Sequence, residues 1–396
     1  TPAGEEKLQV RASGTASVKF PWVAGKREFG YAAVATVLAG GKSMHSNMEY
    51  FSVSTPIWKT ALQGDGFITW FGRENIIAPR VEDNRRSYIN VEEAFSWQPS
   101  SWDNLNPTND DWYTGQCNFH NSMKALREWM AGSHANGIKM ITYSWPTVSG
   151  KAGFDWARVH PDHLCREDTG IAPKTDLGDL DLFGVTHDRP ELKAYQSGVW
   201  QYNMMNLGLL RVIHHHAMEV VKSSRNFGWD GIRFDMPPLW SAMGTVDVQK
   251  EVDMLGLRDI MKKIVPEYYD MTNDVWSGEA ISKRNLRYFR HVFTHELSPH
   301  FAMSYNGGGL SPLTEAQTNS FRWESVDGGQ IMNEAIRNCR ALSNYLDVAT
   351  WHVEGVRSFG GYSCLFMVAS PAPLASTYSA IFTFALGSHP YLNYGW

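Results

Sequence analysis

Residues 227–238 read FGWDGIRFDMPP, and this stretch decides the fold that we expect. Apolar residues at 232 and 234 alternate with Arg233 and Asp235, which is the period of a β-strand with two different faces. Two prolines end the strand at once, because proline cannot donate a hydrogen bond to a sheet. Arg233 can keep Asp235 ionised through a charge-assisted hydrogen bond, as a carboxylate nucleophile requires. The alternative is an Arg–Asp pair that caps a strand in an unrelated α/β protein.

Helices and strands alternate on both sides of this stretch. Ser122 is expected to cap a helix that runs to about Ala135, and Gly137 separates that helix from a strand at 138–143. Further helices are expected at about 190–224, 248–264 and 282–293, and further strands at 301–305 and 328–334. The alternation favours a (β/α)8 TIM barrel over a doubly wound sheet, and no G-x-G-x-x-G motif supports a nucleotide site.

The N-terminal part of the chain has a different pattern. Residues 1–90 mix small, β-branched and aromatic residues with glycine and proline, and they predict strands, among them 67–71 and 76–81. We therefore expect a β-rich N-terminal segment at 1–90 and the barrel at 91–396. Two arrangements of the first segment stay open, a small β-domain or the first barrel strand with additions. Completeness of the barrel at the C-terminus also stays open.

Composition restricts the class of protein. Hydrophobic residues make up 43% and charged residues 19%, which is typical of a globular chain, and a net charge of −5 argues against a nucleic-acid partner. No apolar run is long enough to predict a membrane span. Aromatic residues reach 13%, and their flat faces suit stacking on sugar rings. No cofactor is expected. No metal site is expected either, because consecutive helical residues such as His214, His215 and His216 point about 100° apart, and these three histidines are expected on a solvated helix face.

The cysteines show no metal or redox motif. Cys117, Cys165, Cys339 and Cys364 are widely spaced, so free thiols are expected, and disulfides stay open if the protein is secreted. The chain begins at Thr1, which is compatible with a removed signal peptide. We expect an extracellular or periplasmic protein, with a cytoplasmic location as the alternative. The sequence supports no expectation for the oligomeric state.

Two parts of the sequence carry a family resemblance. Residues 230–235, DGIRFD, resemble the strand-four nucleophile motif of the alpha-amylase-like barrels, and Asp235-Met236 resembles the alpha-glucosidase and alpha-galactosidase barrels. The segment from Gly137 to Tyr143, with His160-Pro161-Asp162, is similar to the early strand and acidic loop of those enzymes. The resemblance covers about 121–240. The Asn-His and His-Asp pairs of alpha-amylase itself are not found.

The resemblance implies a retaining glycoside hydrolase that acts on an α-linked glycan or glycoside. Asp235 would be the nucleophile and Arg233 its electrostatic partner. A second carboxyl group would act as acid/base, roughly 5–5.5 Å away. Glu334 is favoured because it ends a better formed strand, two strands beyond that of Asp235, and Glu279, one strand beyond it, is the alternative. A non-catalytic carbohydrate-binding or surface-assembly protein on the same scaffold is the rival interpretation.

Aromatic and polar residues in the expected loops are the candidates for substrate binding. They are Trp97, Trp102, Trp112, Tyr143, Trp145, His160 and Asn306. The first three lie in a stretch rich in Asn, Asp, Ser and Pro, which cannot cover an apolar ring well by itself. We therefore expect these tryptophans at the rim of a carbohydrate-binding cleft.

Overall fold

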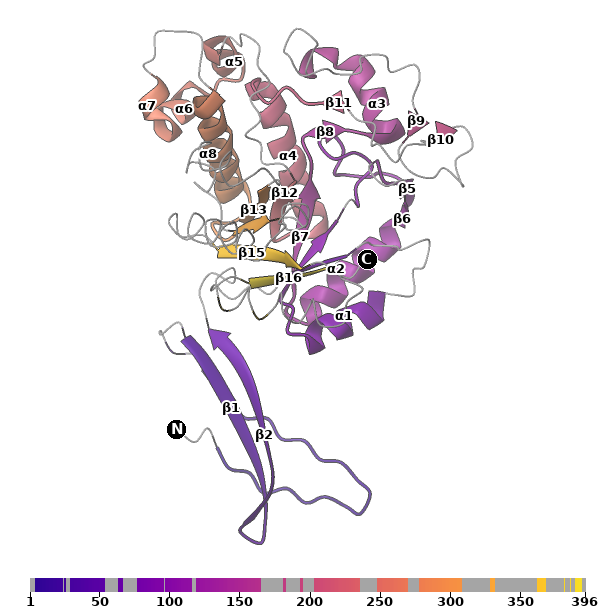
Figure 1. The fold of residues 1–396 in the computed structure, drawn as a ribbon, viewed down its shortest axis with the longest axis vertical. Coiled ribbons are helices and arrows are strands. Elements are labelled where there is room, and N and C mark those ends of the chain that lie inside the picture. Colours follow the sequence, from indigo (N-terminus) through magenta and orange to yellow (C-terminus); the bar gives the residue numbers. More distant parts are fainter. Residues whose placement is uncertain are drawn as a thin grey trace, which may run out of the picture. The chain divides into compact units, whose positions relative to one another are not determined.

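The structure is a computed structural model, and it describes residues 4–23, 25, 29–53, 63–66, 77–95, 97–115, 119–164, 181–182, 193–194, 203–235, 248–269, 278–307, 328–331, 362–367, 381, 385 and 389–393 (Figure 1). The chain divides into two compact units, Thr1–Thr60 and Ala61–Trp396. The division comes earlier than the boundary expected at residue 90. Strand β3 (Gln63–Gly66) and helix α1 (Ile77–Arg86) belong to the second unit, because β3 pairs with barrel strands.

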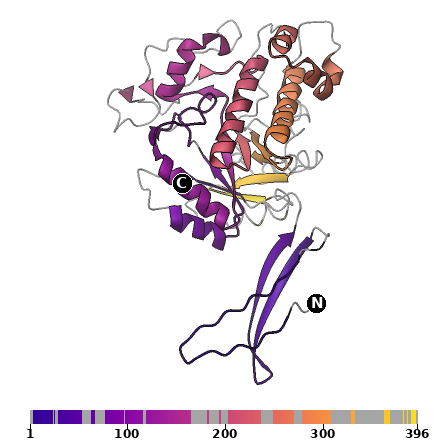
Figure 2. The same ribbon diagram turned by 180° about the vertical axis from the view of Figure 1, so that it is seen from behind.

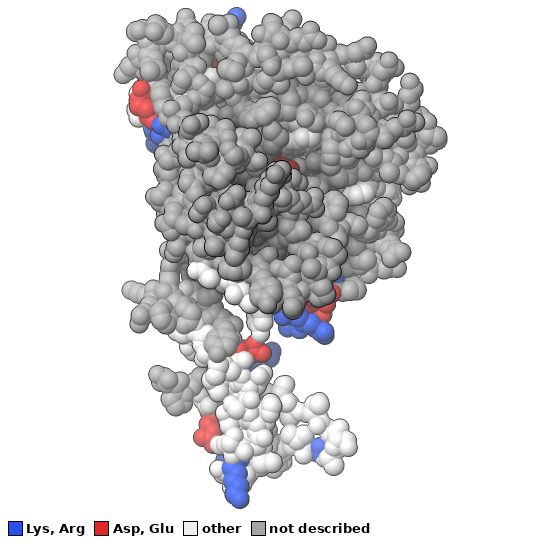
Figure 3. All heavy atoms as spheres, in the orientation of Figure 1, with Lys and Arg blue, Asp and Glu red and all other residues white. Residues whose placement is uncertain are grey.

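The first unit contains a long antiparallel hairpin of β1 (Phe29–Ala39) and β2 (Lys42–Val53). Gly40 and Gly41 connect the strands with φ values of 57° and 80°, which glycine adopts without strain and a two-residue hairpin turn requires. The described side chains of the hairpin carry few charges (Figure 3). Several of its large apolar side chains are exposed, namely Val34, Val37, Leu38, Met44 and Met48.

Eight parallel strands of the second unit pair around a closed ring. In ring order they are β3, β4 (Val91–Ala94), β7 (Lys139–Ser144), β12 (Gly231–Phe234), β13 (Ala302–Gly307), β14 (Gly328–Ile331), β15 (Tyr362–Met367) and β16 (His389–Asn393), which returns to β3. Ring order equals chain order and every pair is parallel, so each connection must cross back along the barrel. The expected α/β class with a parallel sheet is confirmed.

Helices from the first four connections are described. They are α1, α2 (Met123–Ala135), α3 (Gly150–Val159), a 3-10 turn (Pro161–His163), α4 (Leu210–Phe227), α5 (Val248–Met254), α6 (Arg258–Ile264), α7 (Pro266–Tyr269) and α8 (Gly278–Glu296). Short strands outside the ring are β5 (Asp111–Tyr113), β6 (His120–Ser122), β8 (Thr147–Val148), β9 (Asp181–Leu182), β10 (Lys193–Ala194) and β11 (Asn203–Met204). Helices α4 and α8 lie side by side in both views (Figures 1 and 2).

The unit from α2 to β7 follows the sequence pattern. The Ser122 hydroxyl accepts a hydrogen bond from the Ala125 N–H at 3.2 Å and caps the helix. Gly137 has a φ of 74°, which glycine reaches without strain, and the next residues enter β7. The predicted helix, turn and strand are confirmed.

Three predicted elements were wrong in type or extent. Residues 77–86 form α1 instead of a strand, because Glu82 pairs with Arg85 and Arg86 at helical spacing. Helix α4 begins only at Leu210, since β11 and a turn occupy 203–209. The helix expected at 248–264 is split into α5 and α6 at Gly256, whose φ is 65°. The expected strand at 67–71 lies outside the described residues.

The hydrophobic core lies between the ring and the helices that cover it. Ile232 and Phe234 of β12 are fully buried in this layer, and the Phe234 ring lies 5.1 Å from that of Phe289 on α8. Because side chains alternate across a strand, Arg233 and Asp235 point to the inside of the ring. No helix in the described ranges is long and apolar enough to cross a membrane.

Candidate active site

Asp235 lies at the carboxyl end of β12, directly after the last residue of the strand. Its backbone N–H donates a hydrogen bond of 2.6 Å to the carbonyl oxygen of Ser144, the last residue of β7. The two strands are in register here, with Phe234 opposite Ser144. The main chain therefore delivers the Asp235 carboxylate to the end of the barrel at which parallel α/β proteins place their sites.

Arg233 lies between two carboxylates inside the ring. Its Nη1 is 3.3 Å from Oε1 of Glu93 on β4, and its Nη2 is 3.7 Å from Oδ1 of Asp235. The side chains of Arg233 and Glu93 are 2% and 0% exposed, whereas that of Asp235 is 14% exposed. The expected electrostatic pairing of Arg233 with Asp235 is therefore present, and a second carboxylate shares the same guanidinium.

Tyr143 completes the surroundings of the Asp235 carboxylate. Its hydroxyl donates a hydrogen bond of 2.7 Å to Oδ2 of Asp235, and its ring lies 5.6 Å from the guanidinium carbon of Arg233. Tyr143 itself is fully buried on β7. The expected contact of Tyr143 with substrate stays a prediction. Its hydroxyl is directed to Oδ2 of Asp235 and Arg233 faces Oδ1, so the two carboxylate oxygens have different partners.

Glu93 was missed by the sequence analysis. It follows Glu92 in β4, whose four residues are all buried, and alternation sends the two side chains to opposite faces of the strand. Glu92 accepts a hydrogen bond from Trp129 Nε1 at 2.9 Å and pairs with Arg80 on the helix side. The signal in the sequence was the pair of adjacent acids between the apolar residues Val91 and Ala94. In a buried strand one of two adjacent side chains must point to the inside of the ring, and a buried acid there needs a charged or hydrogen-bonding partner.

The second catalytic carboxyl group stays a prediction. Glu334 lies outside the described residues, three positions after β14, which is the second strand beyond β12 as expected. Glu279 is the second residue of α8, not the end of a strand, and its side chain is not described. Asn306 lies on β13, and its side chain is likewise outside the described set.

The expectation that three tryptophans line a cleft was wrong. Trp97 and Trp102 are 0% exposed and Trp112 is 7% exposed, and all three belong to the hydrophobic core. Their polar atoms are used internally, since Trp97 Nε1 donates to Thr142 Oγ1 at 2.9 Å and Trp112 Nε1 donates to the Trp97 carbonyl at 2.7 Å. The loop and the barrel helices together bury these rings. The three tryptophans therefore stabilise the fold and offer no surface for sugar stacking.

The two other described candidates lie in the segment after β7. Trp145 follows β7 directly and is buried, with 8% of its surface exposed. His160 ends α3, and its ring lies 4.5 Å from that of Trp156 and 5.3 Å from that of His163. Trp145 and His160 belong to the segment that connects β7 to α4, and their predicted contact with substrate stays a prediction.

The three consecutive histidines of α4 point in different directions, as helix geometry requires. His214 Nδ1 lies 2.6 Å from the Tyr288 hydroxyl, and the His215 ring lies 5.5 Å from that of Trp156. His216 is fully buried, so the solvated face predicted for the three histidines was wrong at that position, whereas His214 and His215 are half-buried. No group of metal-ligand type is found among the described residues.

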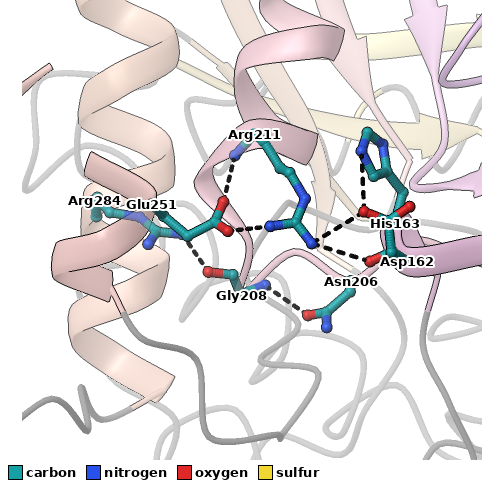
Figure 4. Close-up of polar contacts among 7 residues, drawn as sticks. All are labelled: Asp162, His163, Asn206, Gly208, Arg211, Glu251 and Arg284. Carbon is teal, nitrogen blue, oxygen red and sulfur yellow. Dashed lines mark hydrogen bonds and ion pairs between the residues drawn. The ribbon is translucent and has the colours of Figure 1, made fainter. Parts of the chain in front are cut away.

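A charged cluster joins the N-terminal end of α4 to two neighbouring segments (Figure 4). Arg211 pairs with Glu251 of α5 and, at 3.3 Å, with Asp162 after α3. Arg284 of α8 donates to the carbonyl of Gly208 at 3.0 Å, and burial lowers the pKa of Arg284 to about 10, so it stays charged at neutral pH. The N-termini of barrel helices lie at the carboxyl ends of the strands, so this cluster is on the side of the ring that carries Asp235. It holds together the segments that connect β7 to α4 and β12 to α8 on that side. No local pattern predicted this cluster, because its members are far apart along the chain.

Asp230 lies before β12 and therefore at the opposite end of the strand from Asp235. It accepts hydrogen bonds from His134 Nε2 at 2.9 Å, Lys139 Nζ at 2.8 Å and the Met140 N–H at 3.0 Å. Burial by itself raises the pKa of Asp230, but these donors outweigh it, and the pKa lies below the usual 3.8. The fold is thus stabilised by the ionised carboxylate.

Replacement of Asp230 by asparagine is expected to lower the free energy of unfolding by about 1–2 kcal/mol at neutral pH, the value of a partly exposed set of charge-assisted hydrogen bonds. A lowered carboxyl pKa stabilises the folded state above pH 3.8, and this stabilisation is lost as the pH falls through the lower folded value. The difference between wild type and Asp230→Asn should therefore shrink below pH 3.8, and urea unfolding at neutral pH and at about pH 3 measures it. An equal difference at both pH values would contradict the assignment.

Comparisons with known proteins give the fold but no close relative. No protein-family model and no curated protein matches the chain. The solved structure of a cycloisomaltooligosaccharide glucanotransferase from Paenibacillus sp., in complex with cycloisomaltoheptaose, superposes with a TM-score of 0.57 at 12% identity, over 87% of this chain and 43% of that chain. A beta-galactosidase from Marinomonas ef1 superposes with a TM-score of 0.50 at 11% identity, over 85% of this chain and 54% of that chain.

These similarities establish a shared architecture. The chain has the barrel fold of structurally characterised glycoside-processing enzymes, which agrees with the resemblance found in its motifs. It spans about half the length of the two proteins it superposes on. At these identities the similarity concerns the fold alone, because one barrel scaffold hosts many activities.

Proposed function

We propose that this protein is a retaining glycoside hydrolase or transglycosylase that acts on an α-linked glycan, on a (β/α)8 barrel. The observation that carries the proposal is the position of Asp235 at a strand end, with Tyr143 and Arg233 on its two carboxylate oxygens. The superposition on an enzyme that was solved with a cyclic oligosaccharide supports a carbohydrate as the substrate class. The burial of the three tryptophans means that sugar stacking must come from other residues.

The proposed reaction has two steps. Asp235 attacks the anomeric carbon and forms a glycosyl ester, while the carboxylic acid of Glu334 gives its proton to the departing glycosidic oxygen. The Glu334 carboxylate then takes a proton from water, or from the hydroxyl of an acceptor sugar, whose oxygen attacks the anomeric carbon and releases Asp235. Glu279 replaces Glu334 in the alternative assignment.

Glu93 gives Arg233 a partner throughout this cycle. Asp235 loses its negative charge when it becomes an ester, and an arginine paired with Asp235 alone would then be a buried cation without a counter-charge. Glu93 lies 3.3 Å from the Arg233 guanidinium on its other side and takes no part in the proposed reaction, so it remains beside the guanidinium in that step. The three-residue arrangement therefore accommodates both the free and the glycosylated enzyme.

The nucleophile can be identified by trapping the ester. Incubation with 5-fluoro-α-glycosyl fluorides of the glucose and galactose series should slow the second step more than the first and accumulate an adduct of one sugar per chain. Peptide mass spectrometry should place the adduct on Asp235. An adduct on another carboxylate, or turnover of α-glycosides without any adduct on Asp235, would overturn the assignment, and glycan binding without turnover would favour the non-catalytic rival.

A further inference from the structure

His216 is a fully buried imidazole between α4 and the outside of the ring. Its Nδ1 lies 2.9 Å from the carbonyl oxygen of Trp102, and its Nε2 lies 2.8 Å from the Ser144 hydroxyl. The imidazole also stacks on the Trp102 ring, with 3.8 Å between centroids and 12° between planes. Both ring nitrogens and one ring face are therefore occupied, and none of them faces the inside of the barrel.

These contacts define the tautomer of His216. A carbonyl oxygen only accepts hydrogen bonds, so Nδ1 must carry the hydrogen that is donated to Trp102. Burial lowers the pKa of His216 to about 3, so the ring is neutral at physiological pH and Nε2 has a free lone pair. The Ser144 hydroxyl must then donate to Nε2, which fixes the serine side chain on the outer face of β7.

Ser144 connects this outer contact to the candidate nucleophile. Its carbonyl oxygen accepts the Asp235 N–H at 2.6 Å. The preceding residue, Tyr143, donates to the Asp235 carboxylate from the inner face at 2.7 Å. The end of β7 thus holds Asp235 by its backbone and by its side chain, and His216 holds the end of β7.

We propose that His216 is a positioning residue for Asp235 and acts through Ser144. This inference rests on the proposed function, because it assigns His216 a role in the reaction of the same carboxylate. Without the hydrogen bond between the Ser144 hydroxyl and His216 Nε2, the end of β7 loses its contact with α4. Asp235, which follows the last residue of β12 and is bonded to Ser144, is then expected to move with the end of β7. A displacement of a reacting group by about 1 Å can slow an oriented reaction by roughly 100-fold, so a smaller displacement is expected to slow it by about 10-fold.

The kinetic test uses two substitutions of Ser144 in the full chain. Ser144→Ala removes the donor to His216, and Ser144→Thr keeps a hydroxyl at the same position in a residue that suits a strand. With 4-nitrophenyl α-glucoside or α-galactoside, Ser144→Ala should lower kcat about 10-fold with KM within about twofold, and Ser144→Thr should recover most of the loss. Unchanged kcat in Ser144→Ala, or an equal loss in both variants, would overturn the proposal.

Ser223→Ala is the matched control. Ser223 is a fully buried serine on α4 whose hydroxyl accepts a hydrogen bond from Trp229 Nε1 at 3.0 Å. Its loss should lower the melting temperature about as much as Ser144→Ala does, because each variant removes one buried hydroxyl contact. Only Ser144→Ala should lower kcat, and an equal fall of kcat in both variants would show a general effect of stability.

A second readout does not depend on activity. Selective 15N labelling of aspartate allows amide hydrogen exchange at Asp235 to be followed, with Asp230 at the other end of β12 as the internal reference. Ser144→Ala should speed exchange at Asp235 about 10-fold with little change at Asp230. Unchanged exchange at Asp235 would overturn the link between His216 and Asp235, whereas activity retained in Asp235→Asn would overturn the proposed function and leave the exchange result intact.

Discussion

Asp235→Asn is expected to lower kcat on α-glycosides by roughly a thousandfold or more, because an amide oxygen is too weak a nucleophile to form the glycosyl ester. The fold should be retained, since asparagine has nearly the same size as aspartate. Its amide oxygen can still accept a hydrogen bond from the Tyr143 hydroxyl, which lies 2.7 Å from Oδ2 in the wild type. We expect the free energy of unfolding to change by about 1 kcal/mol or less. Steady-state kinetics and urea unfolding measure the two quantities.

Asp230→Asn provides the control with the same chemical change. Asp230 lies before β12 and is held by His134 and Lys139 at the amino end of the strand, away from the candidate site. This control should lose stability at neutral pH and keep kcat within about twofold, which is the reverse of the result for Asp235→Asn. Full activity of Asp235→Asn on every glycoside that the wild type hydrolyses would exclude Asp235 as nucleophile.

Arg233→Met is expected to lower the free energy of unfolding by about 3–5 kcal/mol, the cost of leaving a buried charge without its partner. Glu93 is completely buried beside this guanidinium, so the substitution removes a cation that lies 3.3 Å from its carboxylate. The activity should also fall, because Oδ1 of Asp235 loses the cation 3.7 Å away. Urea unfolding at neutral pH, with kinetics on the folded fraction, tests both statements.

The double variant Glu93→Leu/Arg233→Met separates charge from packing. Removing both members of a buried pair leaves no orphan charge, so the double variant should be more stable than Arg233→Met alone, although it lacks one more native side chain. Arg233→Lys, which keeps the charge but not the fork that reaches two carboxylates, should be intermediate in stability. A double variant less stable than Arg233→Met would show that Glu93 has another partner that balances its charge.

Local patterns in the sequence predicted the elements that form around the site. The Ser122 cap, the Gly137 turn and the strand that follows are short-range features, and the structure confirms each of them. The alternation around Arg233 and Asp235 likewise predicted β12 and the face to which both side chains point. These predictions succeeded because capping, turn conformation and strand period depend on residues a few positions apart.

Predictions that depended on burial failed. The loop around Trp97 and Trp102 is polar in sequence, but residues of helices α4 and α8 pack on its rings, and these helices come from distant parts of the chain. His216 was assigned to a solvated face, yet it lies against the barrel with Ser144 and Trp102 as partners. The exposure of a side chain depends on which elements pack over it, and a local pattern does not contain that information.

The sequence by itself determined the parallel α/β class, the strand that carries Asp235, and the pairing of Asp235 with Arg233. Only the tertiary structure decided that Glu93 and Tyr143 join them. Glu93 lies 140 positions before its guanidinium partner, and the closure of the ring brings their strands into one interior. Alternation along a strand fixes the face on which a side chain lies, whereas the side chains it meets there depend on strand order and register, which arise when the whole barrel closes.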